Sequence, residues 1–349
     1  MRLGFLMTNP SPTPSRPVAW WLFLCCSLLL IIVVLGGITR LTQSGLSMVE
    51  WKPFAVFPPL GEAEWQAAFL HYQQFPEYKI RTIGMTLDDF KSIFWLEYLH
   101  RLAGRIIGVV FLVPFLWFLV RQKIDHRLGW KLAGLFLLGG VQGIVGWLMV
   151  KSGLTERPDV SQYRLTAHLG LALLIYGLLL WTALGVLQPR RLIPMTSLVL
   201  HLWSVLGLLV LTLLSGGFVA GLDAGFSYNT FPLMNSQLVP EDLWIMEPWY
   251  TNPFENVVMV QFQHRLLAMT TLGAVLLLCR WGSLLPTPAR AAMMLFTAMA
   301  GIQVMLGILT LLLVVPIPLA VTHQVGAFVL FTMGLVTVHL LAVQPPSSL

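Results

Sequence analysis

VAWWLFLCCSLLLIIVVLGGIT, residues 18–39, decides the fold, because it carries no charge over a length that can cross a membrane. The hydrocarbon core of a bilayer is about 30 Å thick and requires roughly 20 consecutive, mostly apolar helical residues. Seven more runs of this kind follow, each bounded by charge or proline. The eight predicted spans cover approximately residues 18–39, 98–120, 130–150, 165–187, 197–219, 257–279, 291–314 and 319–342. Since hydrocarbon offers backbone groups no water, each span should be an α-helix, and the chain an all-α integral membrane protein.

The composition supports a membrane location. Of 349 residues, 57% are hydrophobic and only 10% are charged, whereas soluble domains carry roughly a quarter charged residues. This balance excludes an ordinary cytosolic protein, a disordered chain and a coiled coil. The net charge is +6, but the basic residues form short clusters, so the expected partner is the lipid bilayer and not a nucleic acid. The cysteines lie inside apolar runs without metal-ligand spacing, which indicates a packing role for Cys25, Cys26 and Cys279.

Basic residues in alternate connections predict the orientation. Three short connections are rich in arginine and lysine, as is typical of the cytoplasmic side. They contain Arg121, Lys123, Arg127 and Lys131, then Arg190 and Arg191, and then Arg280 and Arg290. Both termini, residues 1–17 and 343–349, are therefore expected in the cytoplasm, and residues 1–17 resemble neither a signal nor a transit peptide. Every carboxylate except Asp125 lies on the outer side or at its boundary.

The first outer loop is predicted to cover residues 40–96, and a loop of that length is seldom without a function. Its aromatic residues stand among prolines, a composition that suits short helices at the membrane surface. They are Trp51, Trp65, Tyr72, Tyr78 and Trp95.

The two halves of the chain repeat the same signatures in the same order, which indicates an internal duplication. The repeated elements are Gly36-Gly37 with Gly45 and Ser47 against Gly216-Gly217 with Gly225 and Ser227; Gly140-Val-Gln142 with Gly146 against Gly301-Ile-Gln303 with Gly307; and His100-Arg101 against His264-Arg265. We expect two four-helix bundles, residues 18–187 and 197–342, joined by a linker at 188–196 and related by an approximate two-fold axis. Their glycine faces allow close helix contact.

Four histidines lie at matching depth near the outer ends of even-numbered spans, one pair in each half. The pairs are His100 with His168 and His264 with His323. Ionisable residues inside a span are costly, so two matched pairs favour a metal or haem site over packing. No thiolates converge and few carboxylates lie at this depth, so paired imidazoles in an apolar bundle suit haem iron. The other histidines, His71, His126, His201 and His339, are interpreted as ordinary polar or interfacial residues.

The residue three positions before the first histidine distinguishes the two pairs. Glu97 precedes His100 by three residues, which places both on one helix face, whereas the counterpart before His264 is Gln261. This asymmetry suggests chemistry in the N-terminal half and electron transfer in the C-terminal half; the alternative is a helix-start glutamate that interacts with the helix dipole. Three arginines near the outer boundary either pair with haem propionates or extend to lipid phosphate: Arg101, Arg105 and Arg265.

Several longer motifs resemble the haem A synthase family, in order, from about Trp20 to about His339. They are the run from Gly36 to Met48, Pro58-Pro59, Trp65, Glu97-Tyr-Leu-His100-Arg101, Val219 to Gly225, Tyr228 to Met234 and Gln261-Phe-Gln-His264-Arg265. The resemblance implies an eight-helix inner-membrane enzyme that oxidises a methyl group of haem O to a formyl group, giving haem A for terminal oxidases. One branch of the family carries a cysteine pair in outer loops. This sequence has none there and is similar to the proteobacterial and mitochondrial branch, while the missing transit peptide favours a bacterial source.

The resemblance also implies roles for the site residues. His264 and His323 would hold a resident haem b, His100 and His168 would face haem O, and Glu97 would be the catalytic carboxylate, all toward the periplasmic side. Asp223 and Asn229 match an outer-loop motif and either contact haem or shape a turn. A haem O synthase (farnesyltransferase), an electron donor and a second copy of the chain are the candidate partners.

Two other functions compete with this interpretation. A di-haem b-type electron carrier between quinol and a partner would hold two permanent haems and would not need Glu97. A transporter or assembly factor without redox chemistry would bind no haem, and broken spans would favour it. The spans here are mostly uninterrupted.

Overall fold

The computed structural model of the chain describes residues 16–50, 57–155, 158–188, 196–285 and 287–342. Eight of the helices in these ranges are long and apolar enough to cross a membrane. They are α1 (Arg16–Leu41), α4 (Leu87–Val120), α5 (His126–Gly153), α6 (Gln162–Leu187), α7 (Ser197–Gly221), α9 (Val257–Leu278), α10 (Thr287–Leu312) and α11 (Ile317–Ala342). Each predicted span has its helix, and the described ranges contain no β-strand, so the prediction of an all-α integral membrane protein is confirmed.

Helix α4 begins well before the predicted start at residue 98. It starts at Leu87 because Thr86 and Asp89 cap its N-terminus reciprocally. The Asp89 amide donates to the Thr86 hydroxyl at 3.2 Å, and the Thr86 amide donates to the Asp89 carboxylate at 3.1 Å. The predicted loop 40–96 was therefore too long, since its last ten residues continue the spanning helix outward.

Capping also explains the carboxylate that the sequence placed alone on the inner side. Asp125 precedes α5, and its side chain accepts a hydrogen bond from the Leu128 amide at 2.7 Å. A carboxylate at this position satisfies one of the free amides of the first helical turn and interacts favourably with the helix dipole. Asp125 therefore has a structural role.

The first outer segment folds onto the end of α4 through α2 (Glu62–Tyr72) and α3 (Pro76–Ile80). The predicted short helices are therefore present. Trp65 and Tyr72 are buried in an aromatic cluster with Phe90, Phe94 and Tyr98 of α4, so they pack the short helices onto α4, while the position of these helices at the membrane surface stays a prediction. Trp51 lies outside the described residues.

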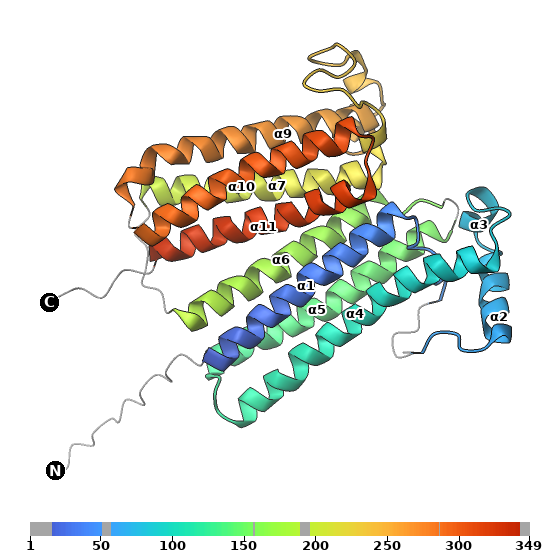
Figure 1. Cartoon of the computed structure of the whole chain (residues 1–349), viewed down its shortest axis with the longest axis horizontal. Coiled ribbons are helices and arrows are strands. Elements are labelled where there is room, and N and C mark those ends of the chain that lie inside the picture. Colours follow the sequence, from blue (N-terminus) through green and yellow to red (C-terminus); the bar gives the residue numbers. More distant parts are fainter. Residues whose placement is uncertain (1–15, 51–56, 156–157, 189–195, 286, 343–349) are drawn as a thin grey trace.

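The spanning helices gather in two groups, as Figure 1 shows: α1, α4, α5 and α6 in one, and α7, α9, α10 and α11 in the other. Between the groups, α6 packs on α7 and α1 packs on α11. A hydrogen bond of 2.6 Å joins Tyr176 of α6 to Thr332 of α11. Cys25 and Cys26 are buried in this apolar core, as predicted, whereas Cys279 is exposed. The two-fold relation between the halves and their boundaries stay predictions.

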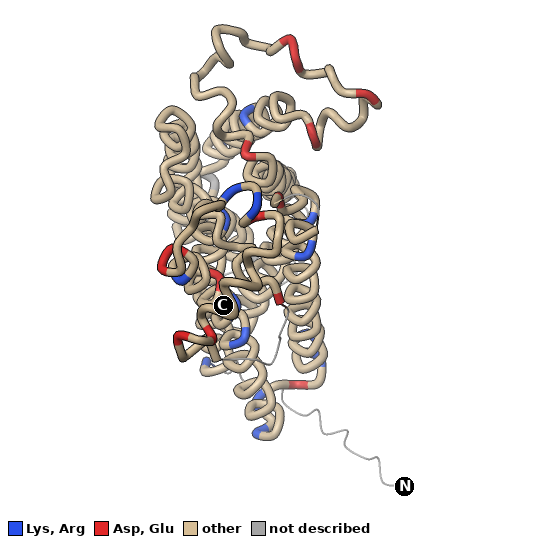
Figure 2. The backbone as a smooth tube through the Cα atoms, turned by 90° about the vertical axis from the view of Figure 1, so that its right-hand side faces the viewer, with Lys and Arg blue, Asp and Glu red and all other residues tan. Residues whose placement is uncertain are grey.

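The segments that connect the helices differ in length and in charge between the two ends of the bundle. Residues 42–50, 57–86 and 222–256 lie at one end, here called the loop end, while the α4–α5 turn and the start of α1 lie at the other (Figure 1). In Figure 2 the large loop at the top contains acidic residues, coloured red. The basic turn residues Arg121, Lys123, Arg127 and Lys131 belong to the opposite end; Arg190 and Arg191 lie outside the described residues.

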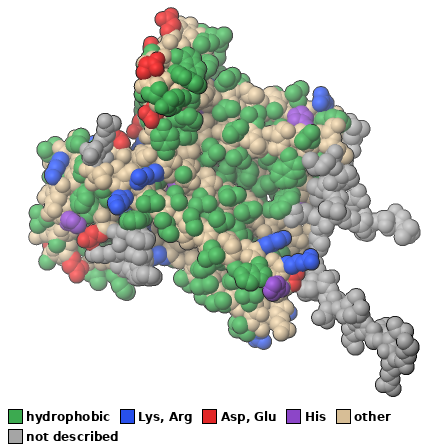
Figure 3. Space-filling view, turned by 180° about the vertical axis from the view of Figure 1, so that it is seen from behind, with side chains coloured by type: hydrophobic (Ala, Val, Ile, Leu, Met, Phe, Trp, Pro, Cys, Tyr) green, Lys and Arg blue, Asp and Glu red, His purple; other side chains and the backbone are tan. Residues whose placement is uncertain are grey.

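Apolar side chains cover the flank between the two ends, which Figure 3 shows from behind. Large exposed hydrophobic residues follow the outward faces of several spans. They include Val109, Val113 and Leu116 of α4, Leu137, Val141 and Ile144 of α5, and Leu276, Met294 and Ile302 of the second half. A surface of this kind is suited to lipid and unfavourable in water, so the chain is a multi-pass membrane protein.

Candidate functional site

All four predicted histidines pack against a glycine of a neighbouring helix. A methyl group added at any of these glycines would lie 2.8–3.3 Å from the Cε1 atom of the imidazole. The pairs are Gly36 of α1 with His100 of α4, Gly146 of α5 with His168 of α6, Gly216 of α7 with His264 of α9, and Gly307 of α10 with His323 of α11. The repeated glycines are therefore the surfaces on which the rings rest, and any larger residue would displace the imidazole.

The N-terminal pair is His100 and His168, which are close enough to interact electrostatically. The Nδ1 atom of each ring is buried and has no hydrogen-bond partner among the described residues. Gln142 reaches His168 through its amide nitrogen, 3.0 Å from the backbone carbonyl and 3.4 Å from Nε2. Two buried imidazoles with unpaired nitrogen atoms are a costly arrangement without a ligand.

The C-terminal pair is His264 and His323, which also interact electrostatically. Here each ring is fixed by a neighbour: the Ser215 hydroxyl lies 2.7 Å from Nδ1 of His264, and the Gln303 amide nitrogen lies 3.1 Å from Nδ1 of His323. Gln303 also donates to the His323 carbonyl at 2.8 Å. Partners of this kind set the orientation of an imidazole and leave its other nitrogen for a ligand.

Glu97 is buried, with 2% of its surface exposed, at the outer end of α4. One carboxylate oxygen accepts hydrogen bonds from the Ser47 hydroxyl and the Met48 amide, both at 2.7 Å. The other oxygen pairs with Arg101 at 2.5 Å. Arg101 continues to the backbone carbonyls of Met48 and Glu50 at 2.8 and 3.0 Å. The carboxyl group is therefore held by Ser47, Met48 and Arg101.

The C-terminal half repeats this arrangement without the charge. Arg265 donates to the carbonyls of Tyr228 and Thr230 at 2.7 and 2.8 Å, in the segment that follows α7. Gln261 is as buried as Glu97, but its amide nitrogen donates to the carbonyls of Ala224 and Tyr228. Both arginines thus bind loop backbone. Whether they also contact propionates stays a prediction, as it does for Arg105, which is half-buried one turn further along α4.

Asp223 and Asn229 shape and fasten the second outer segment. Asp223 adopts a left-handed conformation (φ 52°) after α7 and pairs with Arg40 of α1 at 2.9 Å. Asn229 donates to the carbonyls of Gly225 and Leu311, each at 2.8 Å. Their contacts in the structure are those of a turn and a tether between helix ends.

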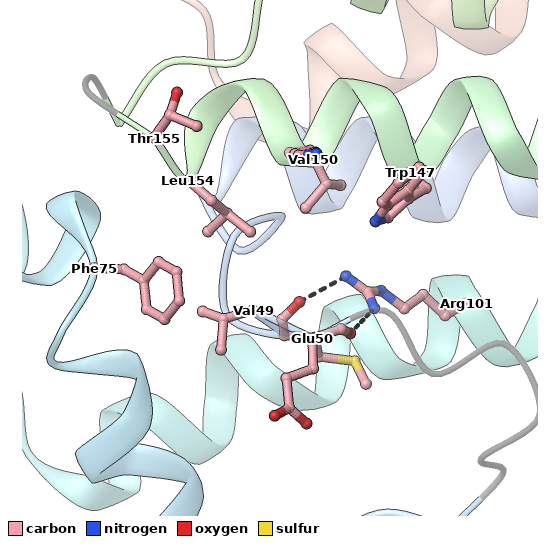
Figure 4. A pocket seen from close by; sticks show the side chains of 10 residues that line it. Val49, Glu50, Phe75, Arg101, Trp147, Val150, Leu154 and Thr155 are labelled. Carbon is pink, nitrogen blue, oxygen red and sulfur yellow. Dashed lines mark hydrogen bonds between the residues drawn. The ribbon is translucent and has the colours of Figure 1, made fainter.

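A hollow of about 290 Å³ lies beside Arg101 at the loop end. Figure 4 shows Arg101 hydrogen-bonded to the loop on one wall, with Trp147 and Val150 of α5 opposite and Phe75 at the far side. Val150 stands one helical turn outward from Gly146, the glycine that supports His168. The hollow therefore lies on the loop-end side of the N-terminal histidine pair, although neither histidine is among its lining residues.

The donor set fits haem better than a closed metal site. Among the described residues, no group of three or more His, Cys, Asp or Glu side chains is placed to hold a metal ion. Paired imidazoles between apolar helices instead suit the iron of a porphyrin, whose flat faces need apolar walls. The unpaired imidazole nitrogens of His100 and His168 and the oriented rings of His264 and His323 are consistent with that class of ligand.

The other histidines take part in local contacts elsewhere. His71 lies 3.9 Å from Glu50, His126 packs edge-on to Trp130, and His339 is buried against Trp181 near the opposite end. Sequence reasoning did not identify Ser47, Ser215 or Glu77 as site residues. It noticed Gln142 and Gln303 only as repeat markers, although their matched positions two residues after a glycine were the available signal.

A bundle of eight spans with two histidine pairs at one end defines a candidate haem-binding membrane protein. The family model described as "Cytochrome oxidase assembly protein" (COX15-CtaA) matches residues 19–335, so the chain belongs to this family. It is 51% identical to "Heme A synthase" of Nitrosospira multiformis over 93% of both chains. It is 49% identical to "Heme A synthase" of Rhodospirillum centenum over 98% of this chain and 94% of the relative. It is 46% identical to "Heme A synthase COX15" of Homo sapiens over 93% and 82%.

Proposed function

We propose that this chain is a haem A synthase, an oxidoreductase that converts a methyl group of haem O to a formyl group and so supplies haem A to terminal oxidases. The observation that carries the proposal is the 51% identity to a protein of that name over 93% of both chains. Two further features are consistent with such a reaction. Each of the four histidine rings rests on a glycine of a neighbouring helix, here called its glycine platform, and the buried carboxyl group of Glu97 lies beside the N-terminal pair.

The two histidine pairs are assigned different haems. His264 and His323 would hold a resident haem b, which supplies one-electron redox chemistry when bound. Ser215 and Gln303 support this assignment because they fix both rings, as a permanent site requires. His100 and His168 would face haem O. Their Nδ1 atoms lack such partners among the described residues, which suits a substrate that must enter and leave.

Glu97 is assigned the role of the catalytic carboxylate. Ser47, Met48 and Arg101 hold its side chain in one position toward the loop end of α4. In this position it would place a water molecule or move a proton beside the methyl group under oxidation, within hydrogen-bond reach. Successive hydroxylations would give a gem-diol that loses water to become the formyl group.

Arginines near both pairs would contact the haem propionates. Arg265 is the better supported of them, since its buried Nε–H has no acceptor among the described residues. Arg101 and Arg105 would do the same for haem O, with Arg101 also holding the loop. The hollow beside Arg101 is the route by which carboxylates of the substrate would reach it.

We place the protein in a bacterial inner membrane with both termini in the cytoplasm and both histidine pairs toward the periplasm. The basic turn at Arg121 to Lys131 supports this orientation, because such residues favour the cytoplasmic side. Residues 18–187 would form the substrate half and residues 197–342 the resident haem half. A haem O synthase, an electron donor and a second copy of the chain are the proposed partners.

The test is to purify the protein in detergent from cells that supply haem O, extract the non-covalent haems and identify them by mass. Wild type should yield haem A or its hydroxylated precursor, and Glu97→Ala should accumulate haem O. Two haem b per chain in both proteins would instead identify a di-haem electron carrier, and no haem would identify a transporter or assembly factor.

A further inference from the structure

A second buried carboxyl group lies in the first outer segment. Glu77 of α3 has 2% of its surface exposed, and its Oε2 atom has no hydrogen-bond partner among the described residues. Burying such a group is unfavourable unless it is neutral or paired. Glu77 is close enough to Glu97 for the two side chains to interact electrostatically. The N-terminal half therefore carries two neighbouring buried acids at the loop end.

Hydroxyl groups connect Glu77 to the surface. The side chain of Glu77 is close enough to the Tyr72 hydroxyl to interact with it, and Tyr72 has no exposed surface. The Tyr72 hydroxyl lies 3.1 Å from the hydroxyl of Thr82. Thr82 lines a broad hollow of about 500 Å³ on the loop-end surface, together with Asp89 and Ser92. Hydroxyl groups both donate and accept hydrogen bonds, so such a series can pass a proton.

We propose that Thr82, Tyr72 and Glu77 form a proton relay from the outer solution to Glu97. The inference rests on the proposed haem A synthase activity, for which Glu97 is the proton-handling group. Only O–H bonds form and break: a proton enters at Thr82, shifts through Tyr72 to Glu77, and leaves from Oε2 of Glu77 to the Glu97 carboxylate. A water molecule can bridge the last gap. No electrons move in the relay.

The charges around Glu77 favour this direction. The groups that face it are Tyr72 from α2, Glu97 from α4 and Arg81, which follows α3 and pairs with Asp159. Burial, with a smaller contribution from the Glu97 charge, raises the pKa of Glu77 to about 8, while Tyr72 and Arg81 act in the opposite sense. Glu77 is therefore protonated at neutral pH, whereas the Glu97 side chain is hydrogen-bonded to the Arg101 guanidinium. The proton lies on the group that Tyr72 and Thr82 connect to the loop-end surface.

The relay would serve the loss of water from the gem-diol. The leaving hydroxyl needs a proton, which Glu97 can give only after it has received one. The other hydroxyl releases its proton to water, so the dehydration consumes no net proton and moves no electrons. In the C-terminal half the buried polar side chains of residues 222–256 are Asn252 and Asn256, which do not titrate. The relay is thus confined to the half that is assigned the chemistry.

The test measures haem A formation against pH in membranes containing the full chain. Glu77→Gln and Tyr72→Phe should lower the rate roughly ten- to a hundred-fold, as expected for a lost proton transfer, with Thr82→Val falling less. The wild-type rate should fall as pH rises through about 8, where Glu77 loses its proton, and this fall should vanish in Glu77→Gln. A small weak acid such as acetic acid should restore the rate of Glu77→Gln.

Two controls separate the relay from packing. Tyr78→Phe removes a hydroxyl from the same aromatic cluster, and Asp88→Asn removes a nearby carboxylate that is 92% exposed; both should leave the pH profile unchanged. Independently of turnover, infrared difference spectra should show a carboxyl proton that titrates near pH 8 in wild type and is absent in Glu77→Gln.

Three results would overturn the relay. The first is a pH profile and rate for Glu77→Gln and Tyr72→Phe equal to those of the controls. The second is a rate lowered by the same factor at every pH without rescue by weak acid, which is the sign of a structural role. The third is an infrared proton signal that persists in Glu77→Gln. A wild type that forms no haem A overturns the proposed function and the relay's task with it, whereas an active wild type with these results overturns the relay alone.

Discussion

In each half an arginine fastens the segment that follows the first spanning helix, α1 or α7. The residue that accompanies this arginine differs between the halves. Arg101 binds the carbonyls of Met48 and Glu50, and Arg265 binds those of Tyr228 and Thr230. The carbonyls lie at the same distance in sequence beyond the repeated glycine pairs. A shared contact of this precision is what the predicted duplication would produce.

The neighbour of each arginine is where the halves diverge. Glu97 accepts hydrogen bonds from the loop, whereas Gln261 donates to it. Each side chain satisfies the buried polar groups around it, so each has a structural role in its own half. Only the carboxylate adds a charge and a site for a proton. The difference therefore concerns chemistry more than folding, and each of the following experiments tests it.

The largest effect is expected from removing a ligand of the resident haem. His264→Ala should lose that haem and lower haem A formation by more than about 100-fold, since even outer partners of a metal ligand contribute 10- to 100-fold. His100→Ala should be as inactive but keep the resident haem. The measurement is haem b per chain after purification. Equal haem b loss in both variants would contradict the division of labour between the halves.

Exchanging the side chains at positions 97 and 261 is expected to have the next largest effect. Glu97→Gln should lower turnover by roughly 100-fold or more, because the proton site is lost, while resident haem content stays normal. Gln261→Glu should bring a carboxylate against the carbonyls of Ala224 and Tyr228 and destabilise the second half instead. Haem identity by mass and thermal unfolding in detergent separate the two outcomes. Full turnover in Glu97→Gln would rule out its catalytic role.

Substitutions at the glycine platforms should have smaller effects than loss of a histidine, and they compare the two histidine pairs directly. Gly146→Ala places a methyl group 2.8 Å from His168, and Gly307→Ala places one 2.9 Å from His323. Overpacking of this kind costs about 1–3 kcal/mol. The first variant should reduce haem O conversion and the second should reduce resident haem, each about ten-fold.

The matched controls for these variants are Gly143→Ala and Gly301→Ala on the same helices, where an added methyl group has nothing within 4 Å. Titration of purified protein with haem gives the affinity of each variant. If the platform variants bound haem as tightly as their controls, the histidines would not need the close approach of the helices.

Much of the site could be predicted from periodic features. The spans follow from uninterrupted apolar runs, and His100, His168, His264 and His323 follow from their matched depth in the two halves of the sequence. These signals are local or repeated, so they survive without coordinates. The glycines that support the rings were visible as repeats, but their partners were not.

What the sequence did not predict depends on how loops return to the helices. Glu77 resembles any loop carboxylate until α3 buries it against Tyr72. The start of α4 at Leu87 depends on a capping pair that lies ahead of the apolar run. The arginines were expected to face propionates or lipid, and their bonds to backbone carbonyls required the folded outer segments. Contacts between distant segments were the common missing information.

The smallest expected effect concerns the contact that ties the halves together at the loop end. Arg40 of α1 donates to the Ala220 carbonyl at 2.7 Å and pairs with Asp223 at 2.9 Å, with side chains 22% and 41% exposed. Solvent screens such a pair, so Arg40→Met should lower the free energy of unfolding by only about 0–1 kcal/mol. Lys91→Met, which removes a pair with Glu62 within one half, is the control. The measurement is thermal unfolding in detergent. A much larger loss in Arg40→Met would mean that the two halves depend on this contact for their stability. The halves would then be less independent than their separate assignments to chemistry and electron transfer require.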